Sequence, residues 1–128
     1  MAIVVTSTNQ QFAGSEAVET DLQATDQTVR NGGTFLFQVK IDNTANSAKS
    51  YVKLYDVATA SVTVGTTVPN FILPCAASST AEYSFFPGAH FNTELCAACV
   101  TTAGTSGNSN PSNSVIVRFL FDSADNDV

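Results

Sequence analysis

The sequence predicts an all-β fold: a single antiparallel β-sandwich, jelly-roll-like, with an extended N-terminal arm. Three observations favour this class: short segments in which apolar and polar residues alternate, clusters of Gly, Pro, Asn and Ser between them, and weak helical signals throughout. At 128 residues the chain has the length of one domain. A chain of this size buries about two thirds of its unfolded surface, enough for one core without disulfides.

The clearest strand covers residues 34–42, between the turn residues 31–33 and the polar residues 43–47. Apolar side chains recur in it at every second position, as they do on one face of a strand. Residues 115–121 have the same spacing and are mostly apolar on both faces, which predicts a central strand or a covered edge. From these two strands we expect a core that contains Phe35, Phe37, Val39, Ile41, Val117 and Phe119.

Shorter strands are expected between these two. Residues 50–56 predict a strand with Val52 and Leu54 on one face and Lys53, with its flanking tyrosines, on the other. A tight turn is expected at Pro87-Gly88. Further strands are expected at 70–74, 80–86, 90–95 and 96–102. Residues 57–68 are small and polar and are expected to form a surface loop. Residues 103–114 are expected to form a long flexible loop.

Charge is distributed unevenly along the chain, whose net charge is −6. Residues 1–26 hold four acids and no base, whereas residues 27–121 hold four acids and all five bases. Together with the few large apolar groups near the N-terminus, this predicts an N-terminal arm at 1–30, a β-sandwich domain at 31–121 and an acidic C-terminal tail at 122–128. The acidic balance also disfavours direct nucleic-acid binding, because affinity for phosphates comes largely from Lys and Arg.

The first residues, MAIVVTSTNQQ, have no basic n-region, and their apolar run is only four residues long. A secretory signal peptide is therefore not expected. The other apolar stretches are too short to cross a bilayer, so we expect no membrane partner and synthesis in a cytoplasm.

The three cysteines, Cys75, Cys96 and Cys99, include a CxxC spacing that is typical of zinc sites and redox motifs. A structural zinc site needs four ligands, and a redox CxxC opens a helix, whereas this segment reads as a strand. Residues three apart on a strand point to opposite faces, so Cys96 and Cys99 are not expected to meet. We expect small buried side chains, with no metal and no disulfide; a pair formed on oxidation is the alternative.

No group of residues in the sequence suggests a reaction. His90 is the only histidine and has no matching nucleophile, which favours a structural or surface position. The segment 122–127 lacks the Gly and the final Glu of an EF-hand loop, and no glycine run opens a helix to bind a nucleotide. Four carboxylates could in principle serve glycoside hydrolysis, but polar strand ends account for them: Asp42, Asp56, Glu82 and Glu94. We expect no enzyme, no catalytic residue and no cofactor.

Several segments between residues 50 and 121 carry a resemblance to a known class. Residues 52–60 read VKLYDVATA, residues 64–69 read VGTTVP, and the apolar strand 71–74 ends in Pro. An aromatic-Pro-Gly stretch at 86–91 and a Thr/Gly-rich segment at 100–104 follow. In these segments the chain resembles small structural proteins of tailed-phage and prophage virions.

The resemblance implies a non-enzymatic capsid cement or decoration protein that binds the outer surface of the head and stabilises it. Its implied partners are the major capsid protein and further copies of itself, in a homo-oligomer expected to be a trimer. The implied location is the virion surface, after assembly in the host cytoplasm. A tail, collar or fibre-associated adaptor is one alternative, and a carbohydrate-binding β-module on a host-facing appendage is another.

Overall fold

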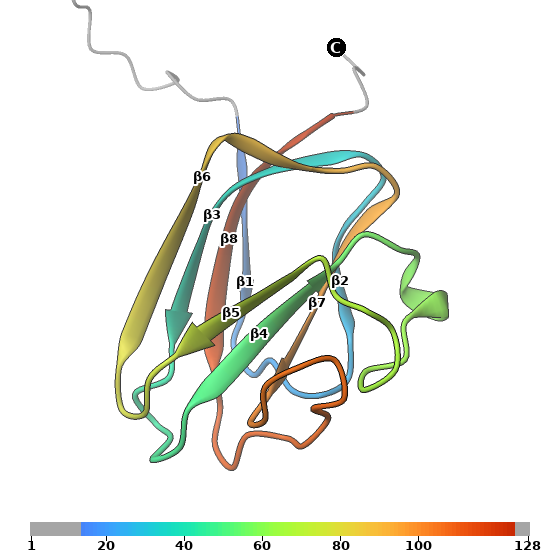
Figure 1. The fold of residues 1–128 in the computed structure, drawn as a ribbon. Coiled ribbons are helices and arrows are strands. Elements are labelled where there is room, and N and C mark those ends of the chain that lie inside the picture. The colour runs from blue at the N-terminus through green and yellow to red at the C-terminus, as the bar shows by residue number, and fades with distance from the viewer. Residues whose placement is uncertain (1–13, 125–128) are drawn as a thin grey trace, which may run out of the picture.

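The computed structural model describes residues 14–124, which form two antiparallel sheets packed face to face (Figure 1). Sheet I contains, in spatial order, β1 (Ser15–Glu19), β8 (Ile116–Ser123), β3 (Thr34–Asp42) and β6 (Thr80–Phe91). Sheet II contains β2 (Gln27–Asn31), β7 (Glu94–Val100), β4 (Ser50–Tyr55) and β5 (Phe71–Cys75). The expected all-β sandwich is confirmed, and β8 is a central strand.

Strand pairing joins the first half of the chain to the second half. β1 pairs with β8, β2 with β7, β3 with β6 and β4 with β5, all antiparallel. The pairs β3–β8 and β4–β7 then complete the two sheets. A 3-10 turn, η1 (Thr59–Ser61), interrupts the connection between β4 and β5. No helix within residues 14–124 is long and apolar enough to cross a membrane.

The main core lies between the sheets and is built from alternate residues of their central strands. Val39 and Ile41 from β3 and Val117 and Phe119 from β8 are at most 1% exposed, as the sequence predicts. Burying each such side chain is worth about 1.5–3 kcal/mol relative to leaving it in water. From sheet II, the same core receives Val52, Leu54, Leu73, Cys75, Leu95, Ala97 and Cys99.

The prediction that Phe35 and Phe37 lie in the core is wrong. The register of β3 against both of its neighbours shifts between Leu36 and Gln38. Such an irregularity changes the alternation of side chains between the two faces. Leu36 is therefore the fully buried residue, whereas Phe37 is half-buried and Phe35 is 38% exposed.

The tight turn expected at Pro87-Gly88 is also not a chain reversal. β6 continues through these residues, and its pairing with β3 moves from Ser84 directly to Ala89. Gly88 has a φ of 143°, and a Cβ there would lie 3.1 Å from the Phe37 ring, so the irregularity requires glycine. The chain reverses after Phe91 instead, which divides the expected strand 90–95 between β6 and β7.

Much of the expected arm belongs to the sandwich. Within residues 1–30, β1 and most of β2 are edge strands of the two sheets, and Leu22 between them is buried in the main core. The N–H of Leu22 donates a hydrogen bond to the Val115 carbonyl at 3.0 Å. Similarly, the first two residues of the expected tail 122–128 belong to β8. Residues 1–13 and 125–128 lie outside the described residues.

Candidate functional site

The outer faces of the two sheets differ in what covers them. On sheet II the outward side chains of β4 and β7 are buried, because two loops, residues 56–70 and 101–114, lie against them. Tyr55, Cys96 and Ala98 form a second small core there with Val62 of the first loop. Within the described residues no loop covers the outer face of sheet I, where Lys40, Glu82 and Arg118 are exposed.

Lys53 fixes the second of these loops. It projects from the outer face of β4, is 0% exposed, and its Nζ donates hydrogen bonds to the carbonyls of Thr105 at 3.1 Å and Gly107 at 2.6 Å. Burial lowers the pKa of Lys53, because the charged form loses its hydration. A Cβ on Gly107 would lie 2.1 Å from the Thr102 carbonyl oxygen, so only glycine fits this loop. Lys53 is thus a structural clamp.

Glu94 fixes the first loop to sheet II. Its carboxylate accepts hydrogen bonds from the hydroxyls of Thr28, at 2.9 Å, and Thr59, and from the Cys96 thiol at 3.3 Å. The bond from the Thr59 hydroxyl lowers the pKa of Glu94 most, burial opposes it, and the bonds from Thr28 and Cys96 add to the lowering. The carboxylate is therefore an ionised acceptor in a structural network.

The cysteines lie where the strand geometry predicts. Cys96 points to the loop-covered face of β7, and Cys99 points into the main core. All three cysteines are buried and have free thiols. Burial raises the pKa of Cys96 and of Cys99 to about 12. Neither residue supplies a thiolate nucleophile near neutral pH, because the thiolate is the reactive form.

The structure separates the four carboxylates considered for hydrolysis. Asp56 accepts hydrogen bonds from the backbone N–H groups of Asn92, at 2.9 Å, and Thr93, at 2.8 Å, and so closes the β6–β7 turn. Glu94 belongs to the network beneath the first loop. Asp42 and Glu82 alone share a surface depression.

The Asp42 carboxylate and the His90 ring both make local contacts within the described residues. Hydrogen bonds from the side chain and backbone of Thr44 lower the pKa of Asp42, which disfavours a role as general acid. His90 stacks on Phe35 with ring centroids 4.7 Å apart. Within residues 14–124 no three His, Cys, Asp or Glu side chains are grouped so that they could hold a metal ion.

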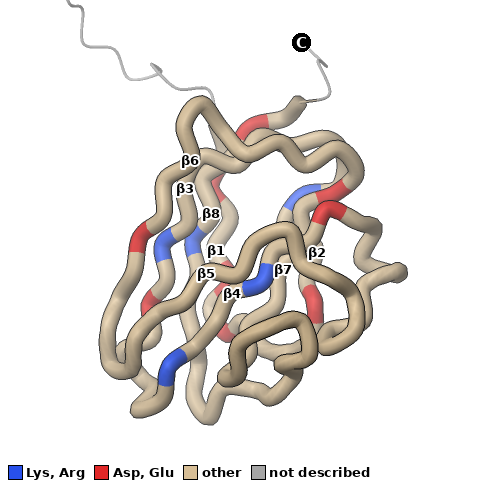
Figure 2. The backbone as a smooth tube through the Cα atoms, in the orientation of Figure 1, with Lys and Arg blue, Asp and Glu red and all other residues tan. Residues whose placement is uncertain are grey.

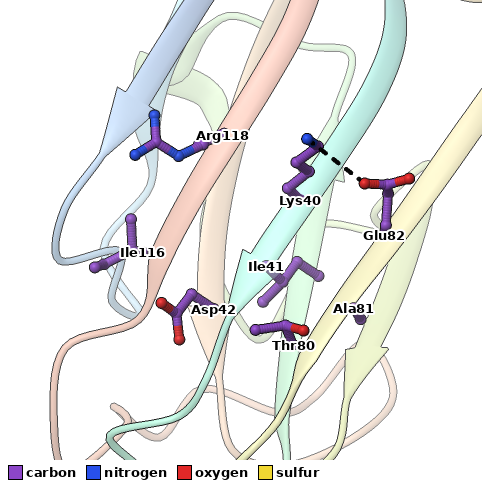
Figure 3. Close-up of a pocket in the computed structure, with 8 residues that line it drawn as sticks. All are labelled: Lys40, Ile41, Asp42, Thr80, Ala81, Glu82, Ile116 and Arg118. Atoms are coloured by element: carbon purple, nitrogen blue, oxygen red, sulfur yellow. Dashed lines mark ion pairs between the residues drawn. The ribbon is translucent and has the colours of Figure 1, made fainter.

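The depression is a pocket on the outer face of sheet I with a volume of about 590 Å³ (Figure 3). The sheet register creates it, because Lys40 lies opposite both Glu82 and Arg118 on the neighbouring strands. Lys40 and Glu82 form an ion pair at 3.7 Å. The lining comes from β3, β6 and β8: Lys40, Ile41, Asp42, Thr80, Ala81, Glu82, Ile116 and Arg118.

The pocket combines the half-buried Ile116 with balanced charge. Two bases, Lys40 and Arg118, offset two acids, Asp42 and Glu82. Arg118 also pairs with Glu16 of β1 at 3.7 Å. Exposed pairs of this kind contribute only about 0–1 kcal/mol to stability, so these charges do little to hold the fold together.

Figure 2 shows the basic positions dispersed over the chain. Lys40 and Arg118 are neighbours, paired across β3 and β8. The described residues therefore show no continuous basic stripe of the kind that tracks a nucleic-acid backbone.

An exposed aromatic side chain lies on the same sheet, farther along β6. Phe86 is 99% exposed, and Phe35 and His90 stack on each other nearby in the same sheet. The sequence marks Phe86 only as the first residue of the aromatic-Pro-Gly stretch 86–91. The exposure of its side chain depends on the position of β6 at the edge of the sheet, which follows from the strand pairing.

Comparison of the chain with family models, curated proteins and solved structures finds no match. The resemblance to phage virion proteins therefore rests on the sequence segments between residues 50 and 121.

Proposed function

We propose that this protein is a non-enzymatic structural component of a tailed-phage virion, a capsid decoration protein that binds the outside of the head and stabilises it. The observation that carries the proposal is the strand order, β1-β8-β3-β6 against β2-β7-β4-β5. Taken with the pairing of the first half of the chain to the second, this order supports an eight-stranded jelly roll. Jelly rolls are common among viral capsid and lectin domains.

Fold alone does not define function, so the surface must also suit the role. Only 12% of residues are charged, and the pocket on the open face of sheet I is lined by two bases and two acids beside Ile116. Such a face can be buried against another protein with little desolvation of unpaired ions. The major capsid protein and further copies of this chain are the partners we propose for it.

The polar groups buried in the structure support a non-enzymatic role. Lys53 and Glu94 are both used to hold loops against sheet II, and Cys96 is a neutral thiol within one of these networks. Loops held in this way give a rigid body. Such a body suits a decoration protein, which stabilises the intact shell by binding to it.

The direct experiment is to strip the protein from purified heads, add it back, and measure both its copy number and the temperature at which DNA is released. A decoration protein approaches the copy number of the major capsid subunit, and stripped heads release DNA at a lower temperature. A small fixed number of copies located at the tail would overturn the proposal in favour of the adaptor alternative. Identical release from stripped and complete heads would also overturn it.

The add-back experiment also tests the N-terminal segment. Deleting residues 1–30 removes β1 and most of β2 and is expected to unfold the sandwich. The informative variant lacks only residues 1–13. If this segment is the attachment arm, the variant folds with an unchanged unfolding midpoint and fails to bind stripped heads.

Jelly rolls also occur in lectins, which favours the carbohydrate-binding alternative as the second candidate. A glycan array with the purified chain separates the two. Specific glycan binding that is lost on substitution of Arg118 would support the lectin reading, and silence on the array would support the structural one.

A further inference from the structure

Phe86 is an apolar group that the sandwich itself does not use. At 99% exposure it is the most exposed of the large apolar side chains described, ahead of Val68 at 74%. Burying a phenylalanine is worth about 20-fold or more in an equilibrium constant, so an aromatic side chain left fully in water is a candidate anchor for a partner.

The pocket on the outer face of sheet I fits such an anchor. Ile116 gives it an apolar side chain, and Lys40 and Arg118 place cations with long aliphatic stems beside it (Figure 3). An aromatic ring gains both from apolar burial and from cations at its face. A volume of about 590 Å³ leaves room for a ring between the side chains.

A copy of the chain cannot fill its own pocket with its own Phe86. Ala81 and Phe86 are five residues apart on the same strand, β6. At about 3.3 Å per residue they are separated by about 16 Å along the strand, which is beyond the length of the side chain. Phe86 of one copy can therefore contact only the pocket of another copy.

Electrostatic repulsion between two copies is smaller at the pocket and around Phe86 than over the acidic parts of the surface. Two copies, each with a net charge of −6, repel each other in general. In the pocket two bases offset two acids, and the residues from Ser84 to Ala89 around Phe86 are uncharged. The two surfaces can meet without placing like charges together.

We propose that Phe86 of one copy inserts into the pocket beside Lys40 and Arg118 of a second copy, and that this contact assembles the chain into a homo-oligomer. The inference deepens the proposed function by naming the surface through which copies associate. A two-fold dimer contains the contact twice, and a ring such as a trimer contains it once at each interface.

The test measures the mass of the purified full-length chain by light scattering and sedimentation over a range of concentrations. Wild type is expected to associate, and F86S is expected to raise the dissociation constant by about 30-fold or more, as the loss of an interface anchor does. The matched control is V68S, which removes another exposed apolar side chain distant in sequence from both surfaces and is expected to leave the mass unchanged. At a concentration low enough for all three proteins to be monomeric, their unfolding midpoints should be equal.

A second variant, T80W, fills the pocket from its rim and is expected to be monomeric on its own. Mixing it with F86S restores one intact contact, because T80W copies keep the aromatic anchor and F86S copies keep the pocket. Association in the mixture supports the proposal. Monomeric wild type, association of F86S equal to wild type, equal loss in V68S, or a mixture that stays monomeric would each overturn it.

Binding to heads tests the proposed function, and self-association tests the present inference, so the two proposals can be overturned independently. A monomeric protein that still binds heads would overturn this inference and leave the proposed function intact. An oligomer that depends on Phe86 but is absent from heads would support the inference and overturn the proposed function.

Discussion

Sheets I and II each have four antiparallel strands, yet their outer faces have opposite surroundings. In sheet II, outward side chains of the central strands β4 and β7 are buried beneath two loops that Lys53 and Glu94 hold in place. The outward side chains of sheet I remain in solvent and form a pocket between Lys40, Glu82 and Arg118. The difference shows that charged side chains hold loops in place on one face and form exposed ion pairs, which contribute little to stability, on the other.

The largest expected difference in the free energy of unfolding is between Ala substitutions of two lysines, Lys53 on sheet II and Lys40 on sheet I. Replacing Lys53 with Ala leaves the carbonyls of Thr105 and Gly107 without their donor and removes a buried side chain, at a cost of about 3 kcal/mol in the free energy of unfolding. Replacing Lys40 with Ala loses only an exposed ion pair, at a cost below about 1 kcal/mol. Urea denaturation measures both free energies of unfolding. Equal losses in the two variants would contradict the claim that only Lys53 stabilises the fold strongly.

A smaller effect is expected in the loop that Lys53 holds. Gly107→Ala places a Cβ against the Thr102 carbonyl oxygen, so we expect a loss of about 2 kcal/mol as the loop shifts from the lysine. Ser106→Ala, at the exposed neighbouring position, is the control and should change stability by less than about 0.5 kcal/mol. Thermal unfolding of the two variants provides the comparison, and an equal midpoint for both would show that the loop is not tightly packed.

Acid should reduce the stability of the loop-covered side of sheet II, because Glu94 becomes protonated. The folded pKa of Glu94 lies below its ordinary value of 4.5, so its contribution to stability is complete above that pH and is lost as the pH falls through the folded pKa. Glu94→Gln should cost about 1 kcal/mol at pH 7, because hydrogen bonds to a charged acceptor are stronger than those to an amide. The cost should disappear in acid. Glu82→Gln on the open face is the control, and its cost at pH 7 should stay below about 1 kcal/mol, because it removes only an exposed ion pair.

The smallest effect is expected from the redox state. The three thiols are buried, and Cys96 and Cys99 point to opposite faces of β7 with pKa values raised to about 12. The unfolding midpoint should therefore be the same with and without a reducing agent. Thiol reagents should label the protein in urea but not in buffer; rapid labelling of the folded protein would contradict the burial of these side chains.

The sequence patterns predict the central strands better than the edges. Val39, Ile41, Val117 and Phe119 are strongly periodic and buried as expected, because both neighbouring strands hold them in register. The sequence predicts an arm where the edge strands β1 and β2 lie, since short edge strands are polar and bury few large side chains. The irregularity that exposes Phe35 depends on the pairing of β3 with both β6 and β8, which no local pattern reveals.

The candidate surfaces were harder still to predict. The pocket exists because residues from β3, β6 and β8 lie at matching register positions, so its members are far apart in the sequence. The burial of Lys53 depends on a loop about 50 residues further along the chain. By contrast, the opposite orientation of Cys96 and Cys99 follows from strand geometry alone and was predicted correctly.

A reconstructed electron cryo-microscopy map of the particle tests the central claim most directly. It is expected to show the β-sandwich repeated over the outer surface of the head, with the outer face of sheet I buried against a neighbouring subunit and the loops over sheet II in solvent. Density for the protein only at the tail, or copies on the head with the outer face of sheet I fully in solvent, would contradict the account.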